Sequence, residues 1–437
     1  MSSLSTQKGI PLVALSKLDL LGIARRLTIL APVSLIISAQ EFVMMTVALL
    51  FLAQCFREHR FSWMRQDWFA AFVALWIWAF ARTLFGHPTA TGLLMALSWI
   101  HLPIFAAALA NWVLPDEATR RRLLFATAGA TTFYSADILL QALSGRDMIG
   151  RPYFQGSNSF RMTSVFGKPG VGAEISWLFL PALLGLFDQG SRWRAAAFGA
   201  LCVAGIVLSG DRMALIVLLG YGVLTALFGG ATRRPLFLAA AASALPVAIV
   251  FFFLPALYER EIESTLDGIR NVGASDYGAI WVSALQLMRD HPFFGVGFHN
   301  FAVACSDLLY GPLTVGPHNY PRCSGHPHNI WLQWLVETGA IGGALFATAA
   351  AFVFIRLTGA LLAHRSTLLF TGLFMTLVMR FEPLSTSTSF LSSWASAPFF
   401  LVLGWGLSFA PRVVQPPKEN GSAALAKSPD EEPCALG

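Results

Sequence analysis

A series of apolar runs, each close to 20 residues long, recurs from residue 27 to residue 409 and constrains the fold more than any other feature. A helix needs about 20 mostly apolar residues to cross a bilayer. Only 12% of the 437 residues are charged, whereas soluble domains carry about 25%. Lipid tolerates only helices and closed barrels, and the alternating ten-residue segments of a barrel are not present. The sequence therefore predicts an all-α polytopic membrane protein.

Run length divides the chain into a membrane domain and two flanking segments. We expect a cytoplasmic N-terminus at residues 1–26, a transmembrane domain at 27–410 and a disordered, proline-containing and acidic cytoplasmic tail at 411–437. About twelve helices are expected from the apolar runs. Their spans are 27–40, 42–56, 67–85, 92–113, 122–143, 171–188, 193–209, 212–229, 235–254, 328–355, 366–381 and 390–409.

The polar segment 255–327 separates the ninth expected helix from the tenth. It is the longest polar insertion in the chain, and it shows no obvious structure of its own in the sequence. Long loops of this kind usually carry function. We therefore expect the functional residues to gather in this loop and at its ends.

Positive charges between the apolar runs predict the orientation of the chain. Cytoplasmic loops of membrane proteins carry an excess of Lys and Arg. Here the clusters of cations all fall on one side of the predicted topology, which places both termini in the cytoplasm and the loop 255–327 outside. No basic run is interleaved with aromatic residues, so the net charge of +6 does not indicate a nucleic-acid partner. The clusters lie at residues 8–26, 57–65, 120–122, 192–194, 233–234, 356–365 and 412–418.

Two of the five cysteines, Cys305 and Cys323, lie in the long loop. If the loop faces the periplasm, a disulfide between them is permitted there. Two unrelated thiols are the alternative, because the sequence contains no geometry that would settle the pairing.

Several arginines lie on the expected outer side, against the charge rule. Arg161 precedes the sixth expected helix, Arg212 opens the eighth, Arg270 lies in the long loop and Arg380 ends the eleventh. An arginine at the outer edge of a membrane helix can bind a phosphate through two parallel hydrogen bonds. For Arg212 the alternatives are an ion pair with Asp211 and a contact with lipid headgroups.

A second group of candidates surrounds the start of the tenth expected helix. His328 opens this helix, and a neutral histidine can accept a proton from a hydroxyl near pH 7. The alternative is that His328 only caps the helix. Asn329 follows it directly, and Glu337 lies nine residues further on. An ionisable residue at that depth is a functional candidate, but we favour a structural role for Glu337 and for Gly339, which permits close packing.

A metal site is a separate alternative for the same region. His299, His318, His326 and His328 share the long loop. No carboxylate or cysteine completes the usual zinc spacing around them. We therefore expect no metal and no other cofactor.

These segments resemble, in order, the O-antigen ligase and polymerase superfamily. His328 to Gly342 resembles its HNxxLxxxxExGxxG pattern, and WVSALQLMRDHPFFGVGFHNF, which begins at Trp281, resembles its segment of the type W-x-x-A-L…P-hydrophobic-hydrophobic-G-x-G. LSGDRMALI, around Arg212, is similar to its arginine segment at an outer helix mouth. RMTSVFGKP, from Arg161, resembles its first outer-loop motif, and RFEPLSTSTSFLSSW, from Arg380, resembles the last outer loop of its ligase-type members.

The resemblance implies a metal-independent membrane glycosyltransferase with a GT-C-like fold in a bacterial inner membrane. Such enzymes take a glycan from undecaprenyl diphosphate on the periplasmic face. The resemblance assigns the role of base to His328 and diphosphate binding to Arg212 and, less directly, to Arg161. The chain departs from the family at Tyr277, four residues before Trp281, where members commonly have arginine. Either Arg270 takes over that role or the second cation comes from elsewhere.

Three functions are consistent with these residues. A ligase would transfer the polymerised glycan to a lipid A–core sugar, and the ligase-like last loop favours this reading. A polymerase for O-antigen or exopolysaccharide would use the same donor with a second lipid-linked glycan as acceptor. A flippase for lipid-linked glycans, or another transporter, is the third reading, but transporters tend to show repeat symmetry and polar residues near the midplane. Membrane lipid is an expected partner in each case.

Overall fold

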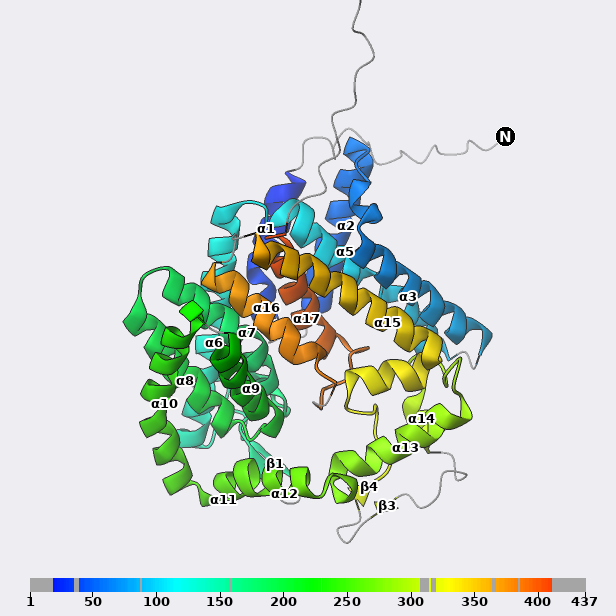
Figure 1. The fold of residues 1–437 in the computed structure, drawn as a ribbon. Coiled ribbons are helices and arrows are strands. Elements are labelled where there is room, and N and C mark those ends of the chain that lie inside the picture. Colours follow the sequence, from blue (N-terminus) through cyan, green and yellow to red (C-terminus); the bar gives the residue numbers. More distant parts are fainter. Residues whose placement is uncertain are drawn as a thin grey trace, which may run out of the picture.

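The computed structural model describes residues 19–34, 39–86, 89–156, 159–228, 230–306, 314–315, 320–363, 367–383 and 386–410. Helices dominate these residues (Figure 1). The N-terminal half contains α1 (Leu20–Ser34), α2 (Gln40–Glu58), η3 (Ser62–Arg65), α3 (Asp67–Phe85), α4 (Ala90–Ser98), α5 (His101–Ala108), η4 (Leu109–Val113), α6 (Glu117–Ser144), η5 (Ser164–Phe166), α7 (Val171–Asp188) and α8 (Arg192–Leu208). The C-terminal half contains α9 (Arg212–Phe228), η6 (Gly230–Thr232), α10 (Arg233–Phe253), α11 (Pro255–Tyr258), η7 (Glu259–Glu263), α12 (Ser264–Arg270), η8 (Val272–Ala274), α13 (Asp276–Asp290), α14 (Phe301–Cys305), α15 (Ile330–Leu362), α16 (Leu368–Phe381) and α17 (Ser393–Leu407).

The strands are short and form two antiparallel hairpins. β1 (Phe154–Gly156) pairs with β2 (Ser159–Arg161), with Phe154 opposite Arg161. β3 (Thr314–Val315) pairs with β4 (Tyr320–Pro321). Neither hairpin forms part of a larger sheet among the described residues.

Among the described residues, seven helical segments are long and apolar enough to cross a membrane, by length and composition. They are Gln40–Glu58, Asp67–Phe85, Ala90–Val113, Glu117–Ser144, Val171–Asp188, Gly230–Phe253 and Ile330–Leu362. The shorter apolar helices are Arg212–Thr225, Leu368–Phe381 and Trp394–Leu407. The fold thus agrees with an all-α, multi-pass membrane protein, and the number of twelve spans stays a prediction.

The first expected span, 27–40, has the wrong boundaries. α1 begins at Leu20 and therefore includes Arg25 and Arg26, which we expected to precede the first helix. The Asp19 carboxylate accepts a hydrogen bond of 2.8 Å from the backbone N–H of Gly22 and so caps the helix at its first turn. Hydropathy alone does not register such a cap.

The expectation that the segment 255–327 lacks structure of its own is also wrong. Much of its described part is helical, from α11 to α14. α13 is amphipathic: Ile280, Ala284 and Leu287 lie on one face and are buried in a small second core with Val296 and Phe301. The many polar residues of the segment concealed the helical spacing of these apolar residues in the sequence.

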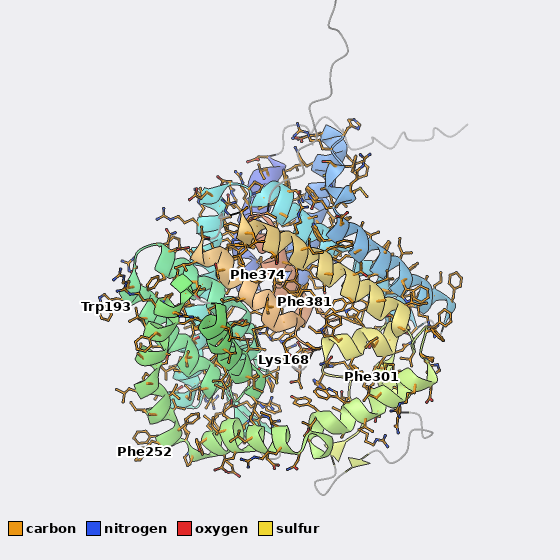
Figure 2. All side chains as sticks on the ribbon, in the orientation of Figure 1. Lys168, Trp193, Phe252, Phe301, Phe374 and Phe381 are labelled. Carbon is orange, nitrogen blue, oxygen red and sulfur yellow. A yellow bond between two sulfur atoms is a disulfide. The ribbon has the colours of Figure 1, made fainter. Side chains whose placement is uncertain are left out.

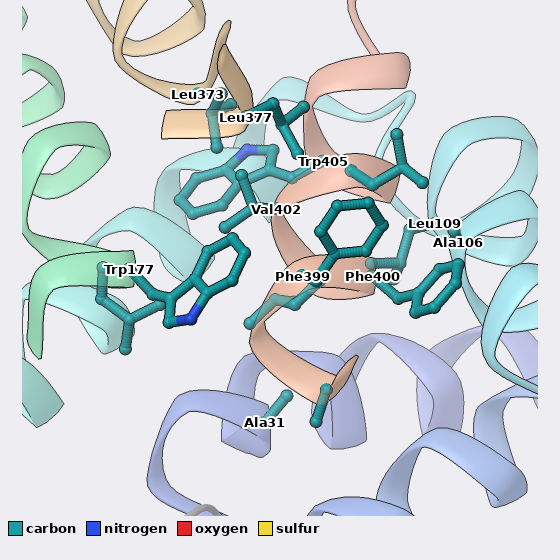
Figure 3. Packing of buried hydrophobic residues seen from close by; sticks show 14 of the residues in the cluster. Ala31, Ala106, Leu109, Trp177, Leu373, Leu377, Phe399, Phe400, Val402 and Trp405 are labelled. Carbon is teal, nitrogen blue, oxygen red and sulfur yellow. The ribbon is translucent and has the colours of Figure 1, made fainter. Parts of the chain in front are cut away.

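The main core of the helical bundle surrounds α17 (Figure 3). Phe399 and Phe400 are fully buried, and the ring of Phe399 lies 6.0 Å from that of Trp177 on α7. Gly404 permits the close approach of α5, since a Cβ there would lie 2.9 Å from the Cα of Ala106. On the outside, large apolar side chains such as Trp193 and Phe252 are exposed (Figure 2), as expected of a surface that faces lipid.

The segment from α11 to α14 runs along one end of the bundle, from α10 to α15 (Figure 1). α15 packs along α3, and α16 packs along α7. The second core joins α13 and α14 to the first turns of α15 through Val336. The segment therefore delivers the chain to the start of α15 in a defined position.

Candidate functional site

His328 lies directly before α15, in a left-handed backbone conformation with φ of 54°. Asn329 is the N-cap of the helix, because its Oδ1 accepts a hydrogen bond of 2.9 Å from the backbone N–H of Leu332. The Nδ2 of Asn329 donates to the carbonyl oxygen of Pro383 at 2.7 Å. The helix is thus capped by Asn329, and the side chain of His328 is not needed for that role.

Two other segments hold the histidine in place. The backbone N–H of Ser387 donates to the carbonyl oxygen of His328 at 2.7 Å, and the indole N–H of Trp281 on α13 donates to the carbonyl oxygen of Pro327 at 3.0 Å. The ring of Tyr277, also on α13, lies 5.3 Å from that of His328. The last outer loop and α13 therefore both contact the start of α15.

A second histidine accompanies the first. The rings of His326 and His328 are 4.0 Å apart, and Nε2 of His326 lies 3.3 Å from the carbonyl oxygen of Ser387. A carbonyl oxygen only accepts, so this nitrogen carries the proton. Burial lowers the pKa of His328, and burial together with the neighbouring His328 lowers the pKa of His326 to about 4. Both rings are therefore neutral at pH 7, which leaves His328 able to accept a proton.

Glu337 is buried in α15 and is occupied by structural contacts. Its carboxylate accepts a hydrogen bond from the backbone N–H of His299, and its backbone carbonyl accepts one of 2.9 Å from Gly297. Nε2 of Gln333 lies 3.4 Å from the other carboxylate oxygen. These contacts attach the segment that follows α13 to the first turns of α15.

α15 is kinked at Gly339, which has φ of 70° and ψ of −175°. The loop after α13 fits against the kink: the backbone N–H of Ala340 donates to the carbonyl oxygen of Pro292 at 2.8 Å. A Cβ at Gly339 would lie 2.1 Å from the carbonyl oxygen of Phe293, and one at Gly295 would lie 2.5 Å from the backbone carbon of Glu337. Two glycine motifs far apart in the sequence thus pack backbone to backbone.

Three arginines from separate elements lie near one another. Arg161 ends β2, Arg212 is the first residue of α9 and Arg260 lies in η7. Nε of Arg260 donates to the carbonyl oxygen of Gly210 at 3.0 Å. Burial, together with the nearby positive charges of Arg161 and Arg212, lowers the pKa of Arg260 to about 10. Such mutual repulsion shows that the guanidinium groups lie close to one another.

Tyr277 connects this arginine cluster (Arg161, Arg212 and Arg260) to the histidine. Its ring lies beside His328, and its phenol is close enough to Arg260 to act on the pKa of that residue. The position where the family commonly has arginine therefore lies between the two groups of functional candidates.

The other two candidate arginines lie elsewhere. Arg270 is exposed in the last turn of α12. Arg380 is buried between α16 and α7, where it donates to Oγ of Ser176 and lies 4.2 Å from the centre of the Trp177 ring. Arg380 lies in the last turn of its helix, as expected, and packing against α7 encloses its side chain.

The first and last outer-loop motifs also meet. Nζ of Lys168, whose side chain is exposed, is 4.8 Å from the ring centre of Trp394. The ring of Phe166 lies 5.1 Å from the same indole. The two motifs are separated by more than 200 positions in the sequence and are brought together only by the fold.

Cys305 and Cys323 form a disulfide that ties α14 to the stretch before His326. Beside it, Arg322 is anchored to α13 through Oγ of Ser283 at 3.1 Å and Oε1 of Gln286 at 2.6 Å. Both links limit the movement of the chain that leads to His328.

No group of three or more His, Cys, Asp or Glu side chains suited to a metal ion comes together within the described residues. His318, which belonged to the metal alternative, lies outside them. His326 and His328 are paired with each other and with the backbone of Ser387 instead.

The helices, the exposed apolar surface and the position of the site define the class as a multi-pass membrane protein with a polar site at one end. A family model described as O-antigen ligase matches residues 197–347. This match confirms the resemblance to the O-antigen ligase and polymerase superfamily that was stated from the sequence, and members of the matched family are glycosyltransferase-like enzymes. The matched region contains Arg212, Arg260, Tyr277 and His328. No curated protein matches the chain.

Sequence reasoning assigned no specific role to Arg260 or Glu261 and did not predict that the rings of His326 and His328 lie side by side. The first two belong to a short charged stretch, ERE, extended by Ile262 and Glu263, directly after an apolar run. Adjacent positive and negative charges at an expected membrane boundary could have marked this stretch as a candidate site. The sequence contains no sign that this stretch faces Arg161 and Arg212.

Proposed function

We propose that the protein is an O-antigen ligase that transfers a glycan from undecaprenyl diphosphate to lipid A–core on the periplasmic face of the inner membrane. The observation that carries the proposal is the position of Tyr277, which has a neutral histidine on one side and the arginine cluster on the other. A base next to a group of cations is what transfer from a diphosphate-linked sugar requires.

In the proposed reaction His328 accepts the proton of the acceptor hydroxyl. The oxygen then forms a bond to the sugar carbon that carries the diphosphate, and the bond from that carbon to the diphosphate oxygen breaks. Arg161 and Arg212 stabilise the negative charge on the departing diphosphate, because charge-assisted hydrogen bonds strengthen as that charge develops. The reaction as written needs no metal and no cofactor.

The ligase assignment over a polymerase rests on the last outer loop. Ser387 lies in this loop and contacts both His326 and His328. A loop with the ligase-type pattern thus forms a wall of the site where the acceptor would bind. A polymerase for O-antigen or exopolysaccharide would use the same donor-binding residues and differ in the acceptor that binds next to this loop.

Two observations support the proposed orientation, with both termini in the cytoplasm. The Cys305–Cys323 disulfide lies in the same segment as His328, and disulfides persist in oxidising compartments such as the periplasm. The clusters of Lys and Arg fall on the opposite side of the expected topology.

A lipopolysaccharide gel on cells that lack the gene tests the function, with the wild-type gene or His328→Ala added back. We expect the deletion strain to lose the glycan ladder from lipid A–core and to accumulate long lipid-linked chains. His328→Ala should fail to restore the ladder although its protein level and membrane insertion match wild type. A ladder that collapses to a single repeat would instead indicate a polymerase, and an unchanged ladder would contradict both assignments.

A further inference from the structure

The departure at Tyr277 leaves open which residue supplies the second cation to a diphosphate. Arg270 and Arg260 are the candidates in the same segment. Arg270 is exposed at the end of α12, whereas Arg260 is partly buried and its charge acts directly on Arg161 and Arg212. The hydrogen bond from its Nε to Gly210 fixes the guanidinium next to the start of α9. The geometry therefore favours Arg260.

Glu261, the next residue, lies in the same cluster. It is 0% exposed, and both of its buried carboxylate oxygens lack a hydrogen-bond partner. Its charged neighbours are Arg260 on its own element, Asp211 and Arg212 at the start of α9, and Arg161 at the end of β2. A buried carboxyl group without hydrogen bonds is costly, so its place among three arginines calls for an explanation.

We propose that Arg260 and Glu261 complete the donor site: Arg260 supplies the second guanidinium for the diphosphate, and Glu261 is the internal carboxylate that competes with the diphosphate for the arginine cluster. The inference rests on the proposed function, because it assigns residues to the donor of that reaction. It transfers the role of the absent family arginine from position 277 to a residue 17 positions earlier in the chain.

The charges in the cluster fit this assignment. Asp211 is already engaged, because its Oδ2 accepts a hydrogen bond of 3.0 Å from the backbone N–H of Ala173. Burial, together with the charge of Asp211, raises the pKa of Glu261 to about 8 although three arginines act against the shift. At pH 7 Glu261 is therefore mostly protonated, and the cluster keeps the excess positive charge that a diphosphate needs.

The sign of the pH dependence follows from this. Below pH 8 Glu261 is neutral and leaves the arginines to the diphosphate. Above pH 8 it ionises and competes for them, so the affinity for a diphosphate falls as pH rises. At pH 9 Glu261 is still protonated in about one molecule in eleven. If only the protonated form leaves the arginines free for the diphosphate, the affinity for a diphosphate falls about tenfold.

The first experiment measures binding of undecaprenyl diphosphate, without a glycan, to the purified full-length protein in detergent. We expect Arg260→Gln to weaken binding by about tenfold or more at pH 7, as loss of a charge-assisted hydrogen bond does. Arg289→Gln removes an exposed arginine from the last turn of α13 and should bind like wild type. Normal binding by Arg260→Gln, or a larger loss in Arg270→Gln, would overturn the assignment.

The second experiment compares wild type with Glu261→Gln from pH 6.5 to pH 9, so that titration of the lipid itself cancels. The two dissociation constants should be similar at pH 6.5, and wild type should bind about tenfold more weakly than Glu261→Gln at pH 9. A ratio that does not change with pH would overturn the role of Glu261.

The same assay separates this inference from the proposed function. His328→Ala should bind undecaprenyl diphosphate like wild type, because it removes the base and leaves the cluster intact. If wild-type protein did not bind the lipid at all, the donor itself would be wrong and both proposals would fall. If wild type bound and Arg260→Gln bound equally well, only the inference would fall.

Discussion

At the scale of single residues, His328 combines an uncommon backbone conformation with a neutral side chain. A left-handed conformation costs a non-glycine residue roughly 1–2 kcal/mol. The bond from Ser387 to its carbonyl oxygen and the capped start of α15 hold it there. Strained residues of this kind are common at functional sites, and here the conformation places the ring between His326 and Tyr277.

Arg212 provides a prediction at the same scale. A lysine keeps the charge but lacks the planar fork that binds two phosphate oxygens at once. We expect Arg212→Lys to lower the rate of transfer by roughly 10- to 100-fold, the value of one charge-assisted hydrogen bond. Transfer is measured in membranes with a lipid-linked donor at matched protein levels. Full activity in the lysine variant would remove Arg212 from the diphosphate site.

At the scale of elements, the connection between α13 and α15 depends on backbone contact rather than on side chains. The loop after α13 enters the kink at Gly339, and hydrogen bonds from Val296 and Gly297 reach the carbonyl oxygens of Val336 and Glu337 at 2.9 Å. Glu337 closes the same junction through the N–H of His299. Glu337 and Gly339 thus have a structural role: their contacts fix the position of α13, which carries Tyr277.

Gly339→Ala should disrupt this junction. The residue has φ of 70° with ψ near 180°, a region that is essentially restricted to glycine and costs other residues about 1–3 kcal/mol. The new Cβ would also meet the carbonyl oxygen of Phe293 at 2.1 Å. We expect a lower apparent melting temperature in detergent and loss of transfer.

Gly359→Ala is the matched control on the same helix. No atom lies within 4 Å of a Cβ at Gly359, and alanine favours a helix over glycine by about 1 kcal/mol. This variant should melt at or slightly above the temperature of wild type. Equal melting temperatures for both variants and wild type would show that the kink tolerates a side chain.

At the scale of the whole molecule, the fold places the candidate residues at one end of the helical bundle. The segment α11 to α14 crosses that end, while α1 and α2 lie toward the other (Figure 1). The expected orientation puts the crossing segment in the periplasm, where a lipid-linked glycan would be presented.

Labelling at the two ends of α6 tests this orientation. Ala118 lies in the first turn of the helix and Met148 lies four residues beyond its last residue, Ser144, and both are exposed. Cys55 and Cys202 are buried, and Cys305 and Cys323 are joined to each other; a background with Cys434→Ser therefore limits other labelling. A membrane-impermeant maleimide should label Met148→Cys in whole cells and Ala118→Cys only after the inner membrane is permeabilised. The reverse pattern would invert the orientation and contradict a periplasmic site.

Much of the fold could be predicted because its causes are local. The length of an apolar run and the charges that flank it determine which segments form long apolar helices, and α3, α7, α8 and α9 begin and end within one residue of their expected spans. His328, Asn329 and Glu337 could be located because they belong to one continuous motif. The helices within residues 255–327 were missed because amphipathic helices at the membrane surface carry no long apolar run, and only their buried face reveals the period.

The sequence by itself determined the helical membrane class, the superfamily of the region 197–347 and the position of His328 relative to α15. Only the tertiary structure decided which cations lie near one another. Arg161, Arg212 and Arg260 lie on β2, α9 and η7, and each is about 50 positions from the next in the sequence. Their proximity depends on how these elements pack against one another, and packing is a property of the complete fold that no single stretch of the sequence contains.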